Sequence, residues 1–535
     1  MEVKHDDGNP LQLGDRIIYD GHFATVRYIG EITNTKDSWI GVEWDDSSRG
    51  KHNGTHEGKY YFSTEHPTGG SFVRPKKVKM GVSFYNAFQD RYGEEQGEEA
   101  GVITAELFVL DNNKKKTVVE MVGAKSVNKK QSQLASLVEV MVRDMAVYGV
   151  GPHSSELRTH GHSVEELDMA QNLLPSWCKV AAITECLPGL RSLNVSENKL
   201  VLPSNTAELQ SAFPCLKVLY LNRIPYSWQK ILECSLMFPL LQQLHICFNG
   251  ITNLSDPQGR LQNLTLINLE SNNVQSWSQV LHLSRLPKLE SLIVSDNNID
   301  AIALPDVNYG ETSQHFQALK YLCVNYNKIS EWSSINELNK LKSLKELKMI
   351  QNPLLNTAIP ETVRQLIVAK VASLEHCNRT RVTKEERRGS EIDYLKRFGQ
   401  LWIKSGGSQD ENKNNPSTEF TNEHPRYQEL VRVYGPPENS EMNQKEKTLK
   451  DSLITVTITS PFDPDKGSKQ KKIPGTMTVQ KLKALIMKLF KWDDRELQLS
   501  YETKKMKHVE IELDNDLRAV SFYSIEPGDT ILVRW

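Results

Sequence analysis

The sequence predicts a multidomain protein: a small β-barrel, then an α/β solenoid, then a compact α+β domain. Three observations carry this prediction. Short β-rich segments separated by glycine lie in residues 8–80. A leucine-and-asparagine pattern recurs roughly every 25 residues over 133–400. An alternating strand followed by an amphipathic helix lies in residues 451–535.

The composition is that of an ordinary soluble protein, and the cysteines and the start of the chain favour the cytosol. The 535 residues are 25% charged and 38% hydrophobic, and the net charge is −2, so no general attraction to nucleic acid or membranes is expected. The start of the chain lacks the apolar core of a signal peptide, and no apolar run approaches the ~20 residues that span a bilayer. The seven cysteines form no C-x-x-C pair, which favours reduced thiols over disulfides or a zinc site.

The first part, residues 8–80, is predicted to be a strongly bent β-sheet. Residues 16–19, 24–29 and 40–44 are rich in β-formers, and glycine, asparagine or aspartate separates them. Short strands joined by tight turns of this kind close into a small barrel.

A glycine-bounded loop in this barrel holds the candidate binding site. Lys51, His52 and Asn53 lie between Gly50 and Gly54. Aromatic residues, a cation and a second glycine pair flank the loop, namely Trp39, Gly69, Gly70, Phe72 and Arg74. We expect the glycines to shape the loops and the other residues to form a shallow aromatic groove with a cationic edge. A tight turn without a binding role is the alternative, but it explains only the glycines.

This arrangement resembles the CAP-Gly domain, whose family ligand is the Glu-Glu-Tyr tail of α-tubulin and similar termini. The resemblance implies that six residues bind such a tail: Trp39, Lys51, His52, Asn53, Phe72 and Arg74. The usual family loop is G-K-N-D-G, and His52 and Asn53 replace its middle residues here. An aromatic residue often found before the first tryptophan is also absent from 31–37. Because histidine can still donate a hydrogen bond to a carboxylate, we expect binding to persist with altered strength.

The middle part, residues 133–400, is predicted to be a leucine-rich-repeat solenoid. The pattern L-x-x-L-x-L-x-x-N-x-L places asparagine at 172, 198, 249, 272, 297, 327 and 352, while two weaker copies place Met145 and Ile224 there. Each copy gives one strand whose leucines enter a shared core, and the asparagine amide satisfies backbone groups at the turn. Residues 382–388 and 392–394 resemble the helical cap of such solenoids. Several residues are expected on the concave face: Tyr220, Asn222, His245, Asn268, Glu270, Asn325 and Lys348.

Two segments are predicted to be linkers. Residues 81–132 turn acidic at 94–99 and basic at 114–116, with a strand or two of their own. Residues 401–450 are rich in glycine, serine, asparagine, proline and charge, apart from a helical stretch at 427–431.

The last part, residues 451–535, is similar to ubiquitin. Residues 454–458 alternate as a half-buried strand, an apolar stripe at helical spacing follows over 479–490, and 497–501 and 530–533 are further strands. The chain ends at Trp535 without a Gly-Gly pair, so we expect an interaction module of β-grasp fold that is not conjugated to other proteins.

No catalytic motif is evident. The sequence contains no nucleophile elbow, P-loop, H-E-x-x-H or dinucleotide fingerprint. His153, His160 and His162 lack further ligands at metal-site spacing and are expected on a solvated loop. We therefore predict a protein that is not an enzyme, with no catalytic residue, cofactor or metal.

The order of the three parts resembles one family, tubulin-specific chaperone E. The resemblance covers nearly the whole chain and implies a cytosolic, cytoskeleton-associated chaperone that captures α-tubulin. It further implies that other tubulin folding cofactors and a β-tubulin complex are partners in assembling the α/β heterodimer and in its regulated dissociation. The groove residues would hold the acidic tail, the solenoid the folded body of α-tubulin, and the ubiquitin-like end a cofactor or another tubulin surface.

Two other functions remain open at this point. The first is a microtubule-associated scaffold, although such proteins usually carry coiled coils or basic segments. The second is a ubiquitin-pathway adaptor in which the repeats bind a substrate and the last domain docks to the proteasome. Co-sedimentation with polymer would favour the scaffold, and a rise in tubulin levels on deleting the last domain would favour the adaptor.

Overall fold

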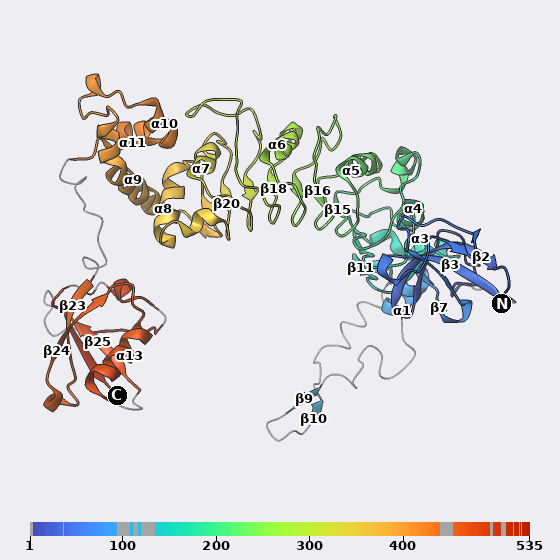
Figure 1. Cartoon of the computed structure of the whole chain (residues 1–535), viewed down its shortest axis with the longest axis horizontal. Helices are drawn as coiled ribbons and strands as arrows, with labels where there is room; N and C mark the ends of the chain where they lie inside the picture. Colours follow the sequence, from blue (N-terminus) through green and yellow to red (C-terminus); the bar gives the residue numbers. More distant parts are fainter. Residues whose placement is uncertain are drawn as a thin grey trace. The chain divides into compact units, whose positions relative to one another are not determined.

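The computed structural model of the chain is shown in Figure 1. It describes residues 4–35, 37–93, 108–110, 116–118, 134–438, 453–492, 496–503, 510–516, 518–523, 525 and 527–535. The chain divides into two compact units. Apart from 396–400, the first runs from residue 1 to residue 436 and the second from 437 to 535.

The N-terminal part of the first unit is an antiparallel sheet with the order β6-β3-β2-β1-β7. These strands are β1 (Arg16–Tyr19), β2 (His22–Glu31), β3 (Ser38–Trp44), β6 (Gly70–Val73) and β7 (Val78–Lys79). A small hairpin joins β4 (Thr55–His56) to β5 (Lys59–Tyr60). Apolar side chains on one face form the core, among them Ile17, Val26, Ile40 and Val42. The predicted β-rich N-terminal domain is confirmed.

The segment after the barrel differs from the predicted linker. Strand β8 (Val82–Ser83) pairs in parallel with β12 (Val147–Gly149), and helix α1 (Phe84–Tyr92) follows directly. Phe84, Phe88 and Tyr92 belong to the buried core of the solenoid, so α1 closes its first repeat. Further along, β9 (Phe108–Leu110) pairs with β10 (Lys116–Val118), which fits the expected strands of this segment. The acidic run 94–99 and residues 114–115 lie outside the described residues.

The solenoid is built on a sheet with the order β11-β13-β14-β15-β16-β17-β18-β19-β20-β21-β22. The parallel strands are β11 (Glu139–Met141), β13 (Glu166–Asp168), β14 (Ser192–Asn194), β15 (Val218–Tyr220), β16 (Gln243–His245), β17 (Leu266–Asn268), β18 (Ser291–Ile293), β19 (Tyr321–Cys323), β20 (Glu346–Lys348) and β21 (His376–Cys377). The central residue of each three-residue strand lies beside its counterpart in the next, as Leu193 does beside Leu219. The predicted repeat register is therefore confirmed.

Two features recur at the turns of the repeats: a buried amide wherever asparagine is present, and a positive φ in every copy. The asparagine amides are buried, and each donates to backbone carbonyls, as Asn272 does to the oxygens of Ile246 and Leu269 at 2.9 Å. The residue before each asparagine position has a positive φ, including those before Met145 and Ile224, so the two weaker copies share the same turn. These residues are Asp144, Gln171, Glu197, Arg223, Phe248, Ser271, Asp296, Tyr326 and Gln351.

Short helices cover the other side of the sheet. They are α3 (Ser154–His160), α4 (Trp177–Thr184), α5 (Trp228–Cys234), α6 (Trp277–Val280), α7 (Trp332–Leu338) and α8 (Pro360–Lys370). The longest repeat, which ends at Asn327, carries its extra residues on this side. There the Lys340 Nζ donates to the carbonyl oxygens of Leu304 and Val307 at 2.9 Å, which fixes the added loop.

The solenoid ends in a helical cap that is larger than predicted. Strand β22 (Thr380–Arg381) leads into α9 (Lys384–Lys404), where the expected cap helix lies. Helices α10 (Thr418–Glu423) and α11 (Tyr427–Tyr434) lie within 401–450. The helical stretch expected at 427–431 is present in α11, but the segment up to residue 436 belongs to the first unit and is not a linker. The buried guanidinium of Arg426 binds Glu391 of α9 and the carbonyl oxygen of Ala369 at the end of α8. These tertiary contacts hold a segment whose polar composition is typical of linkers.

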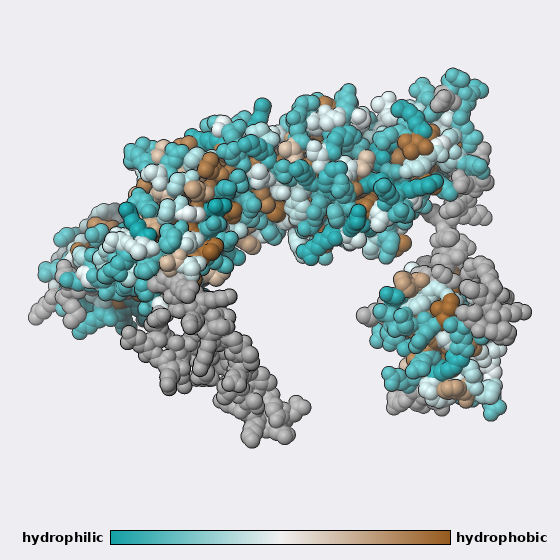
Figure 2. All heavy atoms as spheres, turned by 180° about the vertical axis from the view of Figure 1, so that it is seen from behind, coloured by the Kyte–Doolittle hydropathy of each residue, from teal (hydrophilic) through white to brown (hydrophobic). Residues whose placement is uncertain are grey.

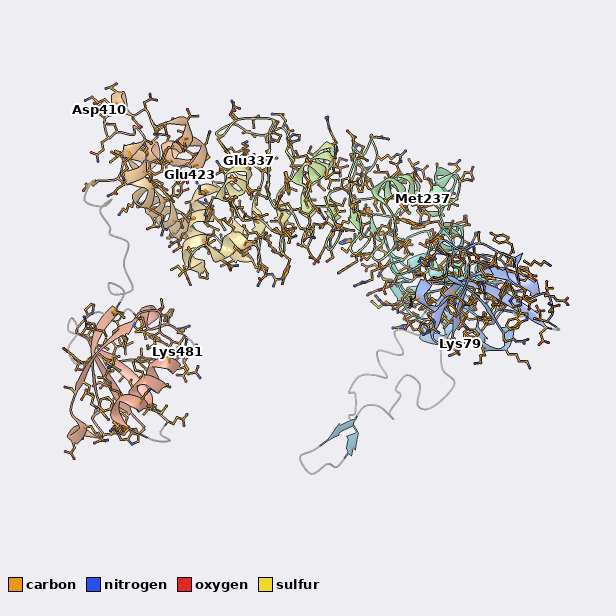
Figure 3. The ribbon with its side chains drawn as sticks, viewed as in Figure 1. Lys79, Met237, Glu337, Asp410, Glu423 and Lys481 are labelled. Atoms are coloured by element: carbon orange, nitrogen blue, oxygen red, sulfur yellow. The ribbon has the colours of Figure 1, made fainter. Side chains whose placement is uncertain are left out.

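A buried lysine also ties the cap to the last repeats. The Lys370 Nζ donates to Asn336 Oδ1 at 2.9 Å and to the carbonyl oxygen of Glu423 at 3.0 Å. Figure 3 labels Glu423 at the end of α10. Burial lowers the pKa of Lys370 to about 8.

The second unit is an α+β domain with the sheet order β24-β23-β27-β25-β26. The strands are β23 (Leu453–Thr459), β24 (Lys469–Pro474), β25 (Gln498–Glu502), β26 (Glu510–Glu512) and β27 (Thr530–Arg534). Helix α13 (Val479–Phe490) buries Val479, Leu482 and Ile486 against them. The β-grasp prediction is confirmed, with one addition. The lysine-rich run 469–472 forms most of the edge strand β24, and its exposed lysines are common on such edges.

Candidate functional site

An aromatic cluster on the barrel surrounds Phe72 of β6. The rings of Tyr28, Tyr61, Phe62 and His52 have centroids 6.3, 5.5, 5.4 and 5.0 Å from that of Phe72. Gly41 pairs with Phe72 across β3 and β6, and a Cβ there would lie 2.8 Å from the Cβ of Tyr28. The absence of a side chain at this point leaves room for the rings. The structure thus brings the predicted Phe72 and His52 together.

Four members of the cluster were not predicted from the sequence: Tyr28, His56, Tyr61 and Phe62. Tyr61 and Phe62 belong to an aromatic run, Tyr60-Tyr61-Phe62, which follows the loop after the short segment 55–59 and is the signal that could have found them. Tyr28 lies on β2 opposite Gly41, and only the strand pairing reveals that position.

Trp39 and Arg74 lie together further along the same face of the sheet. The guanidinium carbon of Arg74 is 3.9 Å from the ring centroid of Trp39, a cation–π geometry. Arg74 also forms an ion pair with Asp37, and both side chains are largely exposed. A carboxylate ligand would therefore compete with Asp37 for the guanidinium of Arg74.

The glycines shape the loop as expected. Gly54 has a φ of +96°, and a Cβ there would collide with the carbonyl oxygen of Phe62. A Cβ on Gly50 would collide in the same way with the carbonyl oxygen of Thr68, and a Cβ on Gly70 would lie 2.7 Å from the His52 carbonyl oxygen. The backbone N–H of Lys51 donates to the Gly70 oxygen at 2.7 Å, which joins the two glycine loops. Gly69 is less tightly confined, since its nearest neighbour, the carbonyl oxygen of His66, would lie 3.3 Å away.

His52 is held by its own loop. The backbone N–H of Gly54 donates to His52 Nδ1 at 3.0 Å, so a neutral ring carries its proton on Nε2. Burial, and then the neighbouring charges of His56 and Lys51, lower the pKa of His52. Asn53 accepts a hydrogen bond from Thr55 Oγ1 at 3.1 Å. The Lys51 side chain is exposed and has no ion-pair partner among the residues that the structure describes.

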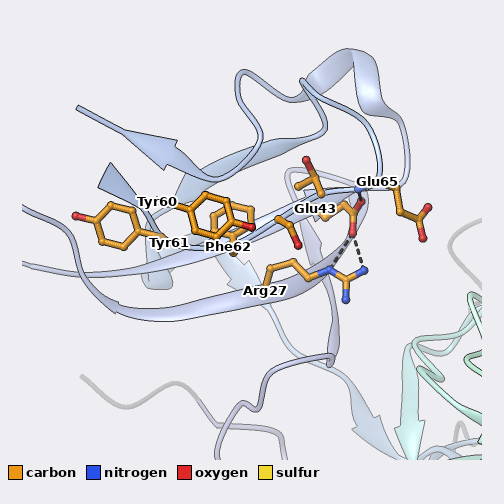
Figure 4. Close-up of a pocket in the computed structure, with 8 residues that line it drawn as sticks. Arg27, Glu43, Tyr60, Tyr61, Phe62 and Glu65 are labelled. Carbon is orange, nitrogen blue, oxygen red and sulfur yellow. Dashed lines mark hydrogen bonds and ion pairs between the residues drawn. The ribbon is translucent and has the colours of Figure 1, made fainter. Parts of the chain in front are cut away.

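A polar hollow lies beside this cluster, with a volume of about 530 Å³ (Figure 4). The buried Glu43 carboxylate accepts from the Arg27 guanidinium at 2.6 Å and from the backbone N–H of Glu65 at 2.6 Å. Because one carboxylate holds both groups, it fixes the segment from Tyr60 to Glu65 that carries Tyr61 and Phe62.

The concave face of the solenoid has an acidic end. Glu139, Glu166 and Asp168 lie on the neighbouring strands β11 and β13 and line a hollow of about 200 Å³ with Tyr220. Further along, the rings of Tyr220 and His245 stack with centroids 4.3 Å apart.

Three of the residues expected on the concave face have structural roles. Asn222 accepts from the backbone N–H of Cys247 at 2.8 Å, Asn268 from that of Glu270 at 3.0 Å and Asn325 from that of Ile350 at 2.8 Å. Hydrophilic residues cover most of the surface seen in Figure 2, and hydrophobic residues appear there as scattered patches.

Other kinds of site are not evident. Within the described part of the chain, no group of three or more histidine, cysteine, aspartate or glutamate side chains could hold a metal ion. None of the described helices is both long and apolar enough to cross a membrane. His153 interacts with Glu156, 2.9 Å away, and both side chains are exposed.

Known proteins share this organisation. A family model described as the CAP-Gly domain matches residues 13–78. The chain is 46% identical to tubulin-specific chaperone E of Xenopus laevis over 97% of this chain and 98% of the relative. It is 42% identical to tubulin-specific chaperone E of Homo sapiens, with 98% of both chains covered. The solution structure of the C-terminal ubiquitin-like domain of mouse tubulin-specific chaperone e is 44% identical, and the match covers 17% of this chain and 94% of that chain, with a TM-score of 0.16.

The fold, the CAP-Gly match and the full-length relatives define a chaperone built from a CAP-Gly domain, a leucine-rich-repeat solenoid and a ubiquitin-like domain. The chain belongs to the tubulin-specific chaperone E family. Because that is a family of chaperones, the prediction of a protein that is not an enzyme is confirmed.

Proposed function

We propose that this chain captures α-tubulin by its acidic C-terminal tail and acts with other tubulin cofactors on the α/β heterodimer. The observation that carries the proposal is the aromatic cluster around Phe72 beside the exposed Lys51. A tail that ends in Glu-Glu-Tyr has the matching chemistry, with one aromatic ring, two side-chain carboxylates and a terminal carboxylate. The name shared by the relatives, tubulin-specific chaperone E, supports tubulin as the partner.

In this proposal, the terminal tyrosine packs against Phe72 and Trp39. The tail carboxylates bind the ammonium group of Lys51 and the guanidinium of Arg74, which exchanges Asp37 for the ligand. His52 donates one hydrogen bond from Nε2, because Nδ1 is already occupied by Gly54. Asn53 lies at the edge of the loop, bonded to Thr55.

The other two domains extend the contact. The solenoid engages the folded body of α-tubulin, and the ubiquitin-like domain binds a folding cofactor, a β-tubulin complex or another tubulin surface. Contacts that are weak one by one add up when they are linked, so three linked modules give a firm grip. The proposed place of action is the cytoplasm, in association with the cytoskeleton. Assembly of the heterodimer and its dissociation both require such a grip on α-tubulin.

The test is binding of a peptide ending in Glu-Glu-Tyr to the full chain, measured by calorimetry. Charge-assisted hydrogen bonds are worth ~1.5–3 kcal/mol each, so Lys51→Ala should weaken binding by about tenfold or more. The matched control is Lys76→Ala, which removes an exposed lysine elsewhere on the barrel. A peptide without the tyrosine should lose most of its affinity, and rising salt should weaken binding. Equal affinity of Lys51→Ala and wild type would show that the loop is only a turn.

A further inference from the structure

The first residues of the chain form a tight turn at the junction between the barrel and the solenoid. The backbone N–H of His5 donates to the Asn9 oxygen at 2.8 Å, and the N–H of Gly8 donates to the His5 oxygen at 3.0 Å. We call residues 5–9 the N-terminal turn. Its side chains reach the barrel, helix α1 and the first repeat of the solenoid.

His5 occupies the centre of this junction. Its ring is buried and stacks on that of Tyr148 in β12, with centroids 3.7 Å apart and planes 12° from parallel. On the barrel side, His5 Nε2 lies 3.3 Å from Asp15 Oδ2, and Nδ1 lies 3.4 Å from the Gly81 carbonyl oxygen. The Lys179 ammonium also lies over the Tyr148 ring, 5.7 Å from its centroid. One side chain thus connects the barrel to the solenoid.

The neighbours of His5 add two further connections. Asp6 accepts from the backbone N–H of Ser83 at 3.0 Å and from the Asn86 amide at 2.6 Å, which ties the turn to helix α1. The hydroxyl of Tyr148 donates to Asp7 and accepts from the Asn9 amide at 3.1 Å. Polar side chains of the turn are therefore paired on both sides of the junction.

The backbones at the junction also lie very close together. The N–H of Val82 donates to the Ala146 oxygen at 3.0 Å, where β8 joins β12. A Cβ on Gly81 would lie 2.6 Å from the Cβ of Tyr148 and 2.8 Å from the Ala146 oxygen, so only glycine fits there. At a second point, Asp45 forms ion pairs with Arg16 of the barrel and, at 3.8 Å, with Lys199 of the solenoid.

We propose that the N-terminal turn is a positioning element, which fixes the groove around Phe72 relative to the concave face so that α-tubulin is held at two points with a set spacing. This inference rests on the function proposed above. Linked sites gain most affinity when the spacing matches the ligand, and a rigid connection keeps that spacing. His5 and Asp7 would then act on tubulin binding without touching tubulin.

The test uses the full chain with His5→Ala and Asp7→Ala combined. The matched control is His282→Ala with Asp300→Ala, because both of these residues are exposed on the solenoid. Spin labels at the exposed Cys215 and at Lys76→Cys, in a Cys178→Ser background, report the distance between barrel and solenoid by pulsed EPR. We expect a narrow distance distribution in wild type and control and a broad one in the variant.

Binding then separates positioning from general damage. Affinity for the Glu-Glu-Tyr peptide should be unchanged, whereas affinity for the αβ-tubulin dimer should fall by about tenfold, which is a part of the 10²–10⁴ gain that linkage can supply. Gly81→Val, which forces the two backbones apart, should give the same pattern. An unchanged distance distribution, or a broad distribution with unchanged dimer affinity, would overturn the inference. If wild type binds neither peptide nor dimer, the proposed function fails, while the distance measurement still reports on the junction.

Discussion

Replacing Asn297 with leucine should destabilise the solenoid by removing one step of its asparagine ladder. The side chain of Asn297 is fully buried, and its Nδ2 donates to the carbonyl oxygens of Leu269 and Ser295, both at 2.9 Å. Its Oδ1 accepts from the backbone N–H of Val274 at 3.1 Å. Leucine has a similar size and cannot make any of these three hydrogen bonds.

The three lost bonds do not cost the same. Asn272 still donates to the Leu269 oxygen, and the N–H of Ser271 still donates to the Ser295 oxygen. Among the described residues, the N–H of Val274 has no other hydrogen-bond partner, so it is left unpaired. An unpaired buried group costs ~1–3 kcal/mol and each of the other two bonds ~0.5–1.5 kcal/mol, so the free energy of unfolding should fall by roughly 2–6 kcal/mol.

Two measurements on the full chain check this prediction. Scanning calorimetry should show a lower melting temperature for the first unit, and hydrogen exchange should speed up at the amide of Val274. The chain should still fold, because the natural repeat with Ile224 at the asparagine position has the same turn geometry. Asn253→Leu is the control, since Asn253 is exposed and bonds only Thr252 among the described residues.

The outcome that contradicts the reasoning is specific. If Asn297→Leu has the melting temperature of wild type and the amide of Val274 exchanges at the wild-type rate, the hydrogen bonds of the Asn297 amide do not support the turn. A loss of stability without faster exchange at Val274 would assign the effect to packing instead of the unpaired N–H.

Three further predictions concern other parts of the chain. Ile486→Asp places a charge in the core of the second unit and should unfold that unit, while the melting of the first unit in calorimetry stays unchanged. The control is Lys481→Asp, on the exposed face of α13, which should leave both melting transitions intact. Lowering the pH from 7.5 to 6.5 should change the affinity for the tail peptide equally in wild type and in His52→Asn. Burial lowers the pKa of His52, and protonation of Nδ1 would break the hydrogen bond that it accepts from Gly54. Tighter binding at pH 6.5 in wild type alone, measured by calorimetry, would refute this. The pKa of Lys370 is about 8 in the folded chain and 10.5 in the unfolded chain, so between these pH values the unfolded chain binds one more proton. The free energy of unfolding should therefore rise with pH across this range by up to about 3 kcal/mol relative to that of Lys370→Met. Urea-unfolding midpoints that change with pH equally in the two proteins would contradict this.

The solenoid could be predicted from the sequence because the same residue types recur at the same spacing in each repeat. A buried asparagine at the turn and leucines at fixed offsets satisfy the backbone within one copy and its neighbour. The weaker copy at Ile224 was placed correctly because the spacing on both sides constrains it, and the copy at Met145 because of its spacing to Asn172. Periodicity therefore compensated for a missing asparagine.

The two ends of the solenoid could not be predicted in the same way. Helix α1 is short, and its aromatic residues become informative only when they meet the first repeat. The cap segment beyond residue 404 is polar, and contacts with residues far away in the sequence hold it, such as those of Arg426 with Ala369 and Glu391. In the groove, Tyr28 was missed for a similar reason, because the pairing of β2 with β3 brings it to Phe72. Each of these features depends on tertiary contacts that no local pattern contains.

The loop fixed by Lys340 shows where this protein tolerates a change in length. That loop makes its repeat the longest, yet β18 and β19 still pair in register through Leu292 and Leu322. Extra residues on the helical side therefore leave the inner surface unchanged, whereas loss of a whole repeat would shorten that surface by one strand spacing, about 4.8 Å. Insertions in the Lys340 loop should accordingly be neutral for any partner that spans the inner surface, and deletion of a repeat should not.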